Sequence, residues 1–305
     1  MRYLLLIIST NLYSMNLLAQ ETYLDQSKEP LFHQITEAYD NALYGRAIDL
    51  ANNYLAQGRQ LNQDHTPTSE TLVNIISRIS AVHLERDGAS LELENYALSI
   101  NPDHLTDKAF FVLGDYFYNE KEYDSAIHYF DQVNELQLTD KQFTEATFKQ
   151  AYSYFVTKDF NAAENKLLQI KDIRDIYYYP ANYYYGMTKY YKRDYDAAIK
   201  SYERVSSSSQ YKAHIPYYIA QIYFAQDKMT ELVSYGEKAI VKPETKKIKE
   251  IRLLLGQAYF QQANYSKALP HLKYYEKNTE KLTNDEFYQL AFTQYQLGQY
   301  ADAKE

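Results

Sequence analysis

A single pattern, repeated about every 35 residues, constrains the fold of this chain more than any other feature. In its clearest copy, two sets of small and apolar residues follow each other: Phe110, Leu113, Gly114 and Phe117, then Tyr123, Ala126, Phe130 and Val133. Spacings of three and four residues place each set on one face of a helix, and the short break between them leaves room only for a tight turn. The pattern therefore predicts a helical hairpin that recurs along the chain.

The copies are nearly regular in length. They start near residues 107, 144, 179, 213, 249 and 284, so the successive spacings are 37, 35, 34, 36 and 35. Two less regular hairpins precede them, one from about Glu29 and one from about Thr71. Between these two, the segment from Gly58 to Ser69 contains turn residues and predicts a longer loop. We expect about eight hairpins, with residues 20–106 forming degenerate ones and residues 107–305 forming six regular units, the last incomplete.

Small residues recur where the two helices of each copy are expected to cross. They are Gly114, Ala126, Ala151, Ala163, Gly186, Ala198, Gly256, Ala268, Ala291 and Ala303. Together with aromatic residues at the eleventh and seventeenth places, this pattern resembles the signature of the tetratricopeptide-repeat family. The resemblance implies an all-α, right-handed superhelical solenoid of helix-turn-helix units, with the two small positions facing each other. Two departures stand out: Leu232 replaces an expected Ala and predicts either loose packing or a more open helix crossing, and Lys189 replaces an expected aromatic residue.

The resemblance also implies a binding surface, because the first helices of the family's units line a concave groove. Carried over position by position, the peptide-binding groove consists of Phe111, Tyr118, Phe148, Tyr152, Phe155, Tyr183, Tyr190, Tyr217, Phe224, Phe260, Tyr288, Phe292 and Tyr295. Aromatic side chains are enriched at interface hot spots. Some chaperone-binding relatives clamp a carboxylate with Lys and Asn, but Lys108 and Lys149 alone do not make that clamp. We therefore expect a neutral or apolar peptide of another protein as the ligand, or a partly buried framework without a ligand.

The N-terminus predicts an export signal. Arg2 is followed by a short apolar run, and the segment stays uncharged up to Gln20 and carries Ala19 before it. This is the order of a cleaved secretory signal over residues 1–19, and the polar residues that interrupt the run argue against a membrane anchor. The predicted location is the periplasm or surface of a Gram-negative bacterium, with no integral membrane segment after signal removal. The expected partners are other proteins or peptides of the cell envelope.

Composition excludes several classes of function. The chain has no Cys, and its 32 basic and 40 acidic residues give a net charge of −8, so neither a thiolate site nor a nucleic-acid partner is expected. The seven His residues form no His-x-x-x-His pair, and no Gly-rich phosphate loop or Gly-x-Ser-x-Gly elbow occurs. We expect no catalytic, metal or cofactor site.

Two alternatives to a protein-binding scaffold stay open. The Tyr stripe suits stacking on sugar rings, which would make the chain a carbohydrate-binding module. The sequence also ends at Glu305, two residues after Ala303 and inside a predicted helix. Since solenoids normally end with a capping helix, we expect a fragment of a larger protein, whose functional domain would lie beyond residue 305.

Overall fold

The computed structural model describes residues 30–61, 67–100 and 104–303, and the predicted signal segment 1–19 lies outside these residues. The described part is helical, and no strand occurs in it. Its α-helices are α2 (Pro30–Asp40), α3 (Tyr44–Leu61), α4 (Pro67–His83), α5 (Ala89–Ser99), α6 (His104–Asn119), α7 (Tyr123–Phe130), α8 (Asp140–Val156), α9 (Phe160–Ile170), α10 (Tyr178–Tyr191), α11 (Tyr195–Arg204), α12 (Ile215–Ala225), α13 (Met229–Ile240), α14 (Ile248–Gln261), α15 (Tyr265–Lys277) and α16 (Asn284–Gln296). A short 3₁₀ turn, η1 (Glu135–Gln137), precedes α8. The prediction of an all-α fold is confirmed.

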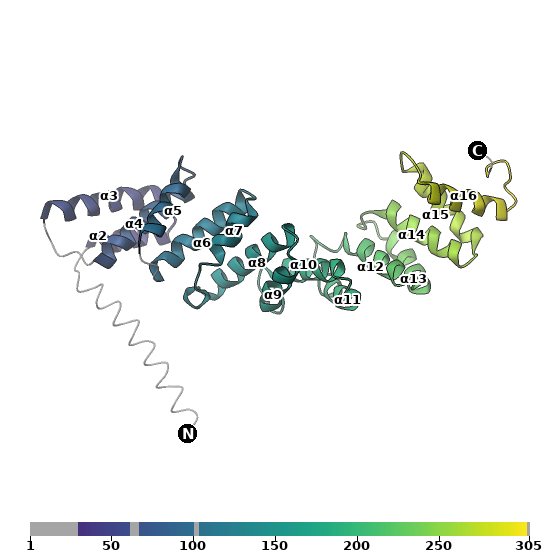
Figure 1. The fold of residues 1–305 in the computed structure, drawn as a ribbon, viewed down its shortest axis with the longest axis horizontal. Coiled ribbons are helices and arrows are strands. Elements are labelled where there is room, and N and C mark those ends of the chain that lie inside the picture. Colours follow the sequence, from purple (N-terminus) through teal and green to yellow (C-terminus); the bar gives the residue numbers. More distant parts are fainter. Residues whose placement is uncertain (1–29, 62–66, 101–103, 304–305) are drawn as a thin grey trace, which may run out of the picture. The chain divides into compact units, whose positions relative to one another are not determined.

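Helices that follow each other in the sequence pair into hairpins (Figure 1). The pairs include α2 with α3, α4 with α5, and α6 with α7 near the N-terminus, then α10 with α11, α12 with α13, and α14 with α15. Within each unit, hairpins also pack on their neighbours, as α4 does on α6 and α12 on α14. This is the arrangement of a repeat solenoid, in which every unit buries its apolar face on its neighbours. The superhelical hand stays a prediction.

The chain forms two compact units, Met1–Ser153 and Tyr154–Glu305, divided inside α8. The predicted change from degenerate to regular hairpins, near residue 107, falls inside the first unit. The six predicted starts lie within four residues of the starts of α6, α8, α10, α12, α14 and α16. The predicted loop from Gly58 to Ser69 is wrong in extent, because α3 continues to Leu61 and α4 begins at Pro67. Proline is well tolerated at the first helical position, since its missing N–H has no partner there.

The same turn follows the first helix of each hairpin. In every copy one residue of this turn adopts the left-handed conformation: Ala42, Glu85, Lys121, Lys158, Arg193, Asp227, Ala263 and Gly298. In the third hairpin, Lys121 N–H bonds to the Tyr118 carbonyl at 3.1 Å and Glu122 N–H bonds to the Phe117 carbonyl at 2.9 Å. Such bonds satisfy the last carbonyls of the first helix, and most helices use glycine at this place. Of the eight residues named above, only Gly298 is a glycine.

The core is a series of apolar clusters, each shared between successive hairpins. In the first unit, Ile75 of α4, Leu93 of α5 and Leu113 of α6 lie fully buried in one cluster. In the second unit, Tyr202 of α11 and Ile219 of α12 share another. A hairpin removed from its neighbours would lose this burial, which is the main favourable term in folding.

The prediction of loose packing at Leu232 is wrong. Leu232 is fully buried, and Gly236 follows it one helical turn later in α13. In the neighbouring hairpin the order of sizes is the reverse, with Ala198 followed by Tyr202. A Cβ on Gly236 would lie 2.9 Å from Leu255 Cδ2 of the next hairpin, so the backbone approaches closely there. The large and small residues have exchanged places, which keeps the core volume filled.

Candidate functional site

The first-helix face is the set of outward positions on the first helix of each hairpin, where the predicted groove residues lie. In the first unit this face contains a group of four tyrosine and phenylalanine rings. Tyr152 of α8 meets Tyr118 of α6 edge to face at 5.6 Å and Phe148 at 6.4 Å between ring centres. Phe111 packs edge to face on Phe130 at 6.3 Å. Phe148 is buried, so it belongs to the framework, whereas Phe111, Tyr118 and Tyr152 are half-buried.

Beside these rings, Lys149 of α8 forms ion pairs with Asp115 of α6 and with Glu145, the latter at 2.7 Å. Its Nζ atom also lies 5.7 Å from the centre of the Tyr118 ring. Burial alone would lower the pKa of Lys149. The hydrogen bonds to the two carboxylates raise this pKa by more than burial lowers it, so the net shift is upward. The ammonium is therefore charged and already neutralised by protein carboxylates.

In the second unit, the rings of α10 and α12 pack on those of neighbouring elements. Tyr183 stacks on Tyr211 with 4.4 Å between ring centres, and burial followed by the neighbouring Tyr218 raises the Tyr183 pKa. Phe155 contacts Phe160 and Tyr184 at 5.8 and 5.3 Å. These rings are half-buried or buried and stabilise the hairpins as well as shaping their surface.

A hydrogen-bonded group on the same face joins α10 to α12. The Tyr190 hydroxyl donates to Gln221 Oε1 at 3.2 Å, and Gln221 Nε2 donates to the Tyr217 hydroxyl at 2.7 Å. Gln221 was missed by the sequence analysis, which selected aromatic residues alone. Gln221 is the ninth residue of its repeat, the place that the predicted groove residues Tyr152 and Phe292 hold in other copies. This shared place could have identified it.

Tyr191 was missed as well, although it directly follows the predicted Tyr190. It is 52% exposed and stacks on Phe160 with 5.0 Å between ring centres. Phe224, predicted at the same repeat position as Tyr190, is half-buried against the cluster of α13 and α14.

Three of the predicted groove residues, Tyr288, Phe292 and Tyr295, lie on α16. Tyr288 and Phe292 pack on each other at 5.7 Å, and both contact Phe260 of α14. Tyr288 and Tyr295 are each 58% exposed. Of the thirteen predicted groove residues, these two present the largest open ring surfaces.

Most of the small residues at the predicted helix crossings are buried. Ala126, Ala151, Ala163, Ala198 and Ala268 are fully inaccessible, while Ala291 and Ala303 are partly exposed. The glycines at these crossings lie close to large side chains. The atoms nearest to a Cβ on Gly114, Gly186 or Gly256 belong to a large side chain one turn beyond the crossing Ala: Phe130, Tyr202 or Leu272.

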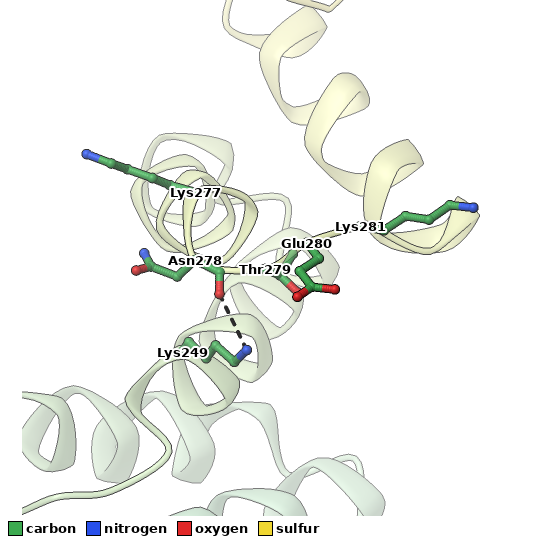
Figure 2. Close-up of a pocket in the computed structure, with 6 residues that line it drawn as sticks. All are labelled: Lys249, Lys277, Asn278, Thr279, Glu280 and Lys281. Carbon is green, nitrogen blue, oxygen red and sulfur yellow. Dashed lines mark hydrogen bonds between the residues drawn. The ribbon is translucent and has the colours of Figure 1, made fainter.

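Two open hollows lie away from the first-helix rings. One, of about 720 Å³, is lined by Lys249 and residues 277–281. Figure 2 shows Lys277 and Lys281 pointing away from each other, while Lys249 donates to the Asn278 carbonyl at 3.4 Å. The ammonium groups of Lys277 and Lys281 therefore do not point toward a common centre. The other, of about 430 Å³, is lined by polar and apolar residues of α3, α4 and α5.

Within the described residues, no group of three or more His, Asp or Glu side chains is placed to hold a metal ion. Among the same residues, no helix is both long and apolar enough to cross a membrane.

No family model matches the chain, and no curated protein matches it. Solved structures do resemble it. The C-terminal part of a TPR repeat-containing protein from Cytophaga hutchinsonii is 18% identical with a TM-score of 0.53, over 85% of this chain and 99% of that one. The apo form of RapI is 14% identical with a TM-score of 0.52, over 88% and 80%.

A third similar structure is that of Naa15/Naa10 bound to HypK-THB, 11% identical with a TM-score of 0.57. The match covers 86% of this chain but 38% of the other, so this chain spans well under half of its length. The helical hairpins, their common turn and these similarities agree. The chain has the helical repeat fold of the tetratricopeptide-repeat proteins.

Proposed function

We propose that this chain is an exported, non-catalytic interaction scaffold that binds a peptide segment of another cell-envelope protein on its first-helix face. The observation that carries the proposal is the repeated exposure of tyrosine on that face. Tyr191, Tyr288 and Tyr295 are each more than half exposed, although tyrosine rings are among the most favourable groups to bury. Tyrosine is enriched among the few residues that supply most of the binding energy at protein interfaces.

The form of the surface supports a peptide as ligand. Successive first helices present similar positions at regular intervals, so an extended or helical segment can meet one ring after another. Among the similar structures, Naa15/Naa10 bound to HypK-THB is that of a complex between proteins. The fold is therefore compatible with protein binding.

The N-terminal sequence supports export. Arg2 and the apolar run after it have the order of a secretory signal, and cleavage after Ala19 would remove one basic residue. The mature chain would then carry 31 basic and 40 acidic residues, a net charge of −9. Such a charge disfavours nucleic acid and leaves envelope proteins as the expected partners.

A pair of variants tests the proposal. The first, Tyr191→Ala/Tyr288→Ala/Tyr295→Ala, removes exposed rings from the first-helix face. The control, Leu168→Ala/Tyr274→Ala, removes exposed apolar side chains from the second helices α9 and α15. After affinity purification from the native cell, the wild type and the control are expected to retain the same partner protein, and the first variant to lose it. Equal retention by both variants would contradict the proposal.

A further inference from the structure

The carboxamide of Gln221 is held between the hydroxyls of two tyrosines from successive first helices. Tyr190 of α10 donates to its oxygen at 3.2 Å, and its nitrogen donates to Tyr217 at 2.7 Å. Both contacts use side chains that are only half-buried, as is Gln221 itself. The amide plane is thus fixed by the protein and remains partly accessible.

These two bonds leave hydrogen-bonding capacity on the group. A carboxamide has two N–H donors and an oxygen that accepts twice. One donor and one acceptor site are used by the tyrosines, which leaves one of each. The Tyr217 hydroxyl accepts from Gln221 and keeps its own hydrogen to donate. A donor and an acceptor on one fixed amide match the N–H and C=O of a peptide main chain.

The surroundings of this amide on α10 and α12 are uncharged. The half-buried or exposed residues of this part of the face are Pro180, Tyr183, Tyr190, Tyr191, His214, Tyr217, Gln221, Phe224 and Ala225. Burial first, then Lys246 and Lys247, lower the pKa of His214 and favour its neutral form. Lys247 lies over the Tyr217 ring at 5.3 Å, but it is balanced by Glu250 at 4.0 Å.

The packing of the rings favours a peptide over a sugar. A sugar stacks on an open aromatic face, whereas a main chain binds through hydrogen bonds. One face of Tyr183 is covered by Tyr211, and one face of Tyr191 is covered by Phe160. Tyr190 meets Tyr218 edge to face at 5.9 Å. The groups that can bind a ligand on this part of the face therefore include the tyrosine hydroxyls and the Gln221 amide.

We propose that Gln221, positioned by Tyr190 and Tyr217, binds the main chain of an extended, uncharged segment of the partner protein. This rests on the proposed function and deepens it, because it names the kind of segment and the residue that recognises it. The fixed amide binds without losing rotamer freedom, since the tyrosines already hold it.

Selection of random peptides on the purified chain, followed by affinity measurements with a synthetic copy of the enriched peptide, tests this. Gln221→Leu is expected to weaken binding about tenfold, the size of one lost hydrogen bond with its partners left unpaired. Gln169→Leu, the same change on an exposed site of the second helix α9, is expected to leave the affinity unchanged. Raising the salt concentration is expected to change the affinity little, since no ion pair is formed.

A second measurement needs no protein variant. Peptides methylated at one main-chain nitrogen at a time lose single N–H donors, and one such peptide is expected to bind about tenfold more weakly than its parent. An affinity insensitive both to Gln221→Leu and to every methylation would overturn the inference and leave the scaffold standing. Enrichment of charged, salt-sensitive peptides would do the same. Both proposals would be overturned if no peptide were enriched and the chain instead bound a glycan array in a way that Tyr191→Ala abolishes.

Discussion

Gly186 lies directly against the ring of Tyr202, so closely that a Cβ on the glycine would come within 2.7 Å of Tyr202 Cε1. Tyr202 is fully buried and stacks on Tyr218 of the next hairpin at 5.8 Å. The same relationship joins Gly114 to Phe130. In these hairpins the glycine of the first helix thus makes room for a large side chain that fills the centre of the repeat.

Gly186→Ala is expected to destabilise the protein by about 1–3 kcal/mol, because the buried Tyr202 ring has no room to move away from the new methyl group. Gly45→Ala in α3 is the control, since nothing lies within 4 Å of its Cβ position. That change is expected to be neutral or to stabilise by up to about 1 kcal/mol through helix propensity. Urea unfolding curves of both variants measure the difference, and similar midpoints for the two would be inconsistent with the close Gly186–Tyr202 contact.

The common turn gives a second prediction. Ala263 has a φ of 56°, a conformation in which its Cβ is crowded by the backbone, whereas Gly298 holds the same place in the last turn with a φ of 74°. Ala263→Gly is expected to stabilise by about 1 kcal/mol and Gly298→Ala to destabilise by about as much. Thermal melts of the two variants against the wild type check this. Shifts in the same direction for both would show that the turn conformation is not the cause.

Lys189, where an aromatic residue was expected, is the centre of an ion-pair network. Its Nζ lies 2.5 Å from Glu164 of α9 and 3.0 Å from Asp194, which caps α11, and its side chain is 13% exposed. Burial lowers the Lys189 pKa, but hydrogen bonds to Glu164 and Asp194 raise it more. Lys189→Ala is expected to cost about 1–3 kcal/mol, since Glu164 keeps one partner in Lys192.

The exposed pair of Lys273 and Asp302 is the control for that variant. Lys273→Ala is expected to change the free energy of unfolding by less than about 1 kcal/mol, because exposed ion pairs contribute little. Chemical denaturation of both variants compares the two pairs. An effect of Lys273→Ala as large as that of Lys189→Ala would contradict the assigned role of burial.

His271 of α15 joins three helices through hydrogen bonds. Its Nε2 atom lies 3.1 Å from Glu237 Oε1 of α13, and its Nδ1 atom lies 3.5 Å from Arg252 of α14. Tyr259 of α14 donates to the same Glu237 oxygen at 2.9 Å. Neutral His271 can make both hydrogen bonds, because its Nε2 donates to Glu237 and its Nδ1 accepts from Arg252. A proton on Nδ1 would instead face the guanidinium.

Burial lowers the pKa of His271 below the usual 6.5, although Glu237 opposes this shift. A histidine with a lowered folded-state pKa stabilises the fold above the unfolded value and loses that contribution as the pH falls. Stability is therefore expected to fall as the pH is lowered below 6.5, and to fall less in His271→Gln. His83 and His214 also have lowered pKa values and account for part of the loss. His128→Gln, at an exposed position, is the control, and equal acid sensitivity of both variants would exclude His271.

The repeat was predictable because its physical cause is local. Helical spacing and a small residue at each crossing are visible in any single copy, and the copies supported one another. Leu232 shows where this fails. Its size alone predicted loose packing, but whether a large side chain fits depends on Gly236 one turn later and on Leu255 of the next hairpin. Such compensation becomes visible only when the hairpins are packed together.

The binding face was predictable only in part for the same reason. Repeat position identified Tyr190 and Tyr217, but it gave no sign of the amide that joins them. Nor did it separate Phe148, which is buried, from Tyr288, which is exposed. Burial of a ring depends on the neighbouring hairpin, and the pattern of one repeat does not contain that information.

Photo-crosslinking in the native cell tests the central claim most directly. A crosslinking amino acid is placed at Tyr191, exposed on the first helix α10, and as a control at Lys200, exposed on the second helix α11. We predict a specific protein adduct from position 191 and none from position 200. An adduct from position 200 alone, or none from either position, would contradict partner binding on the first-helix face.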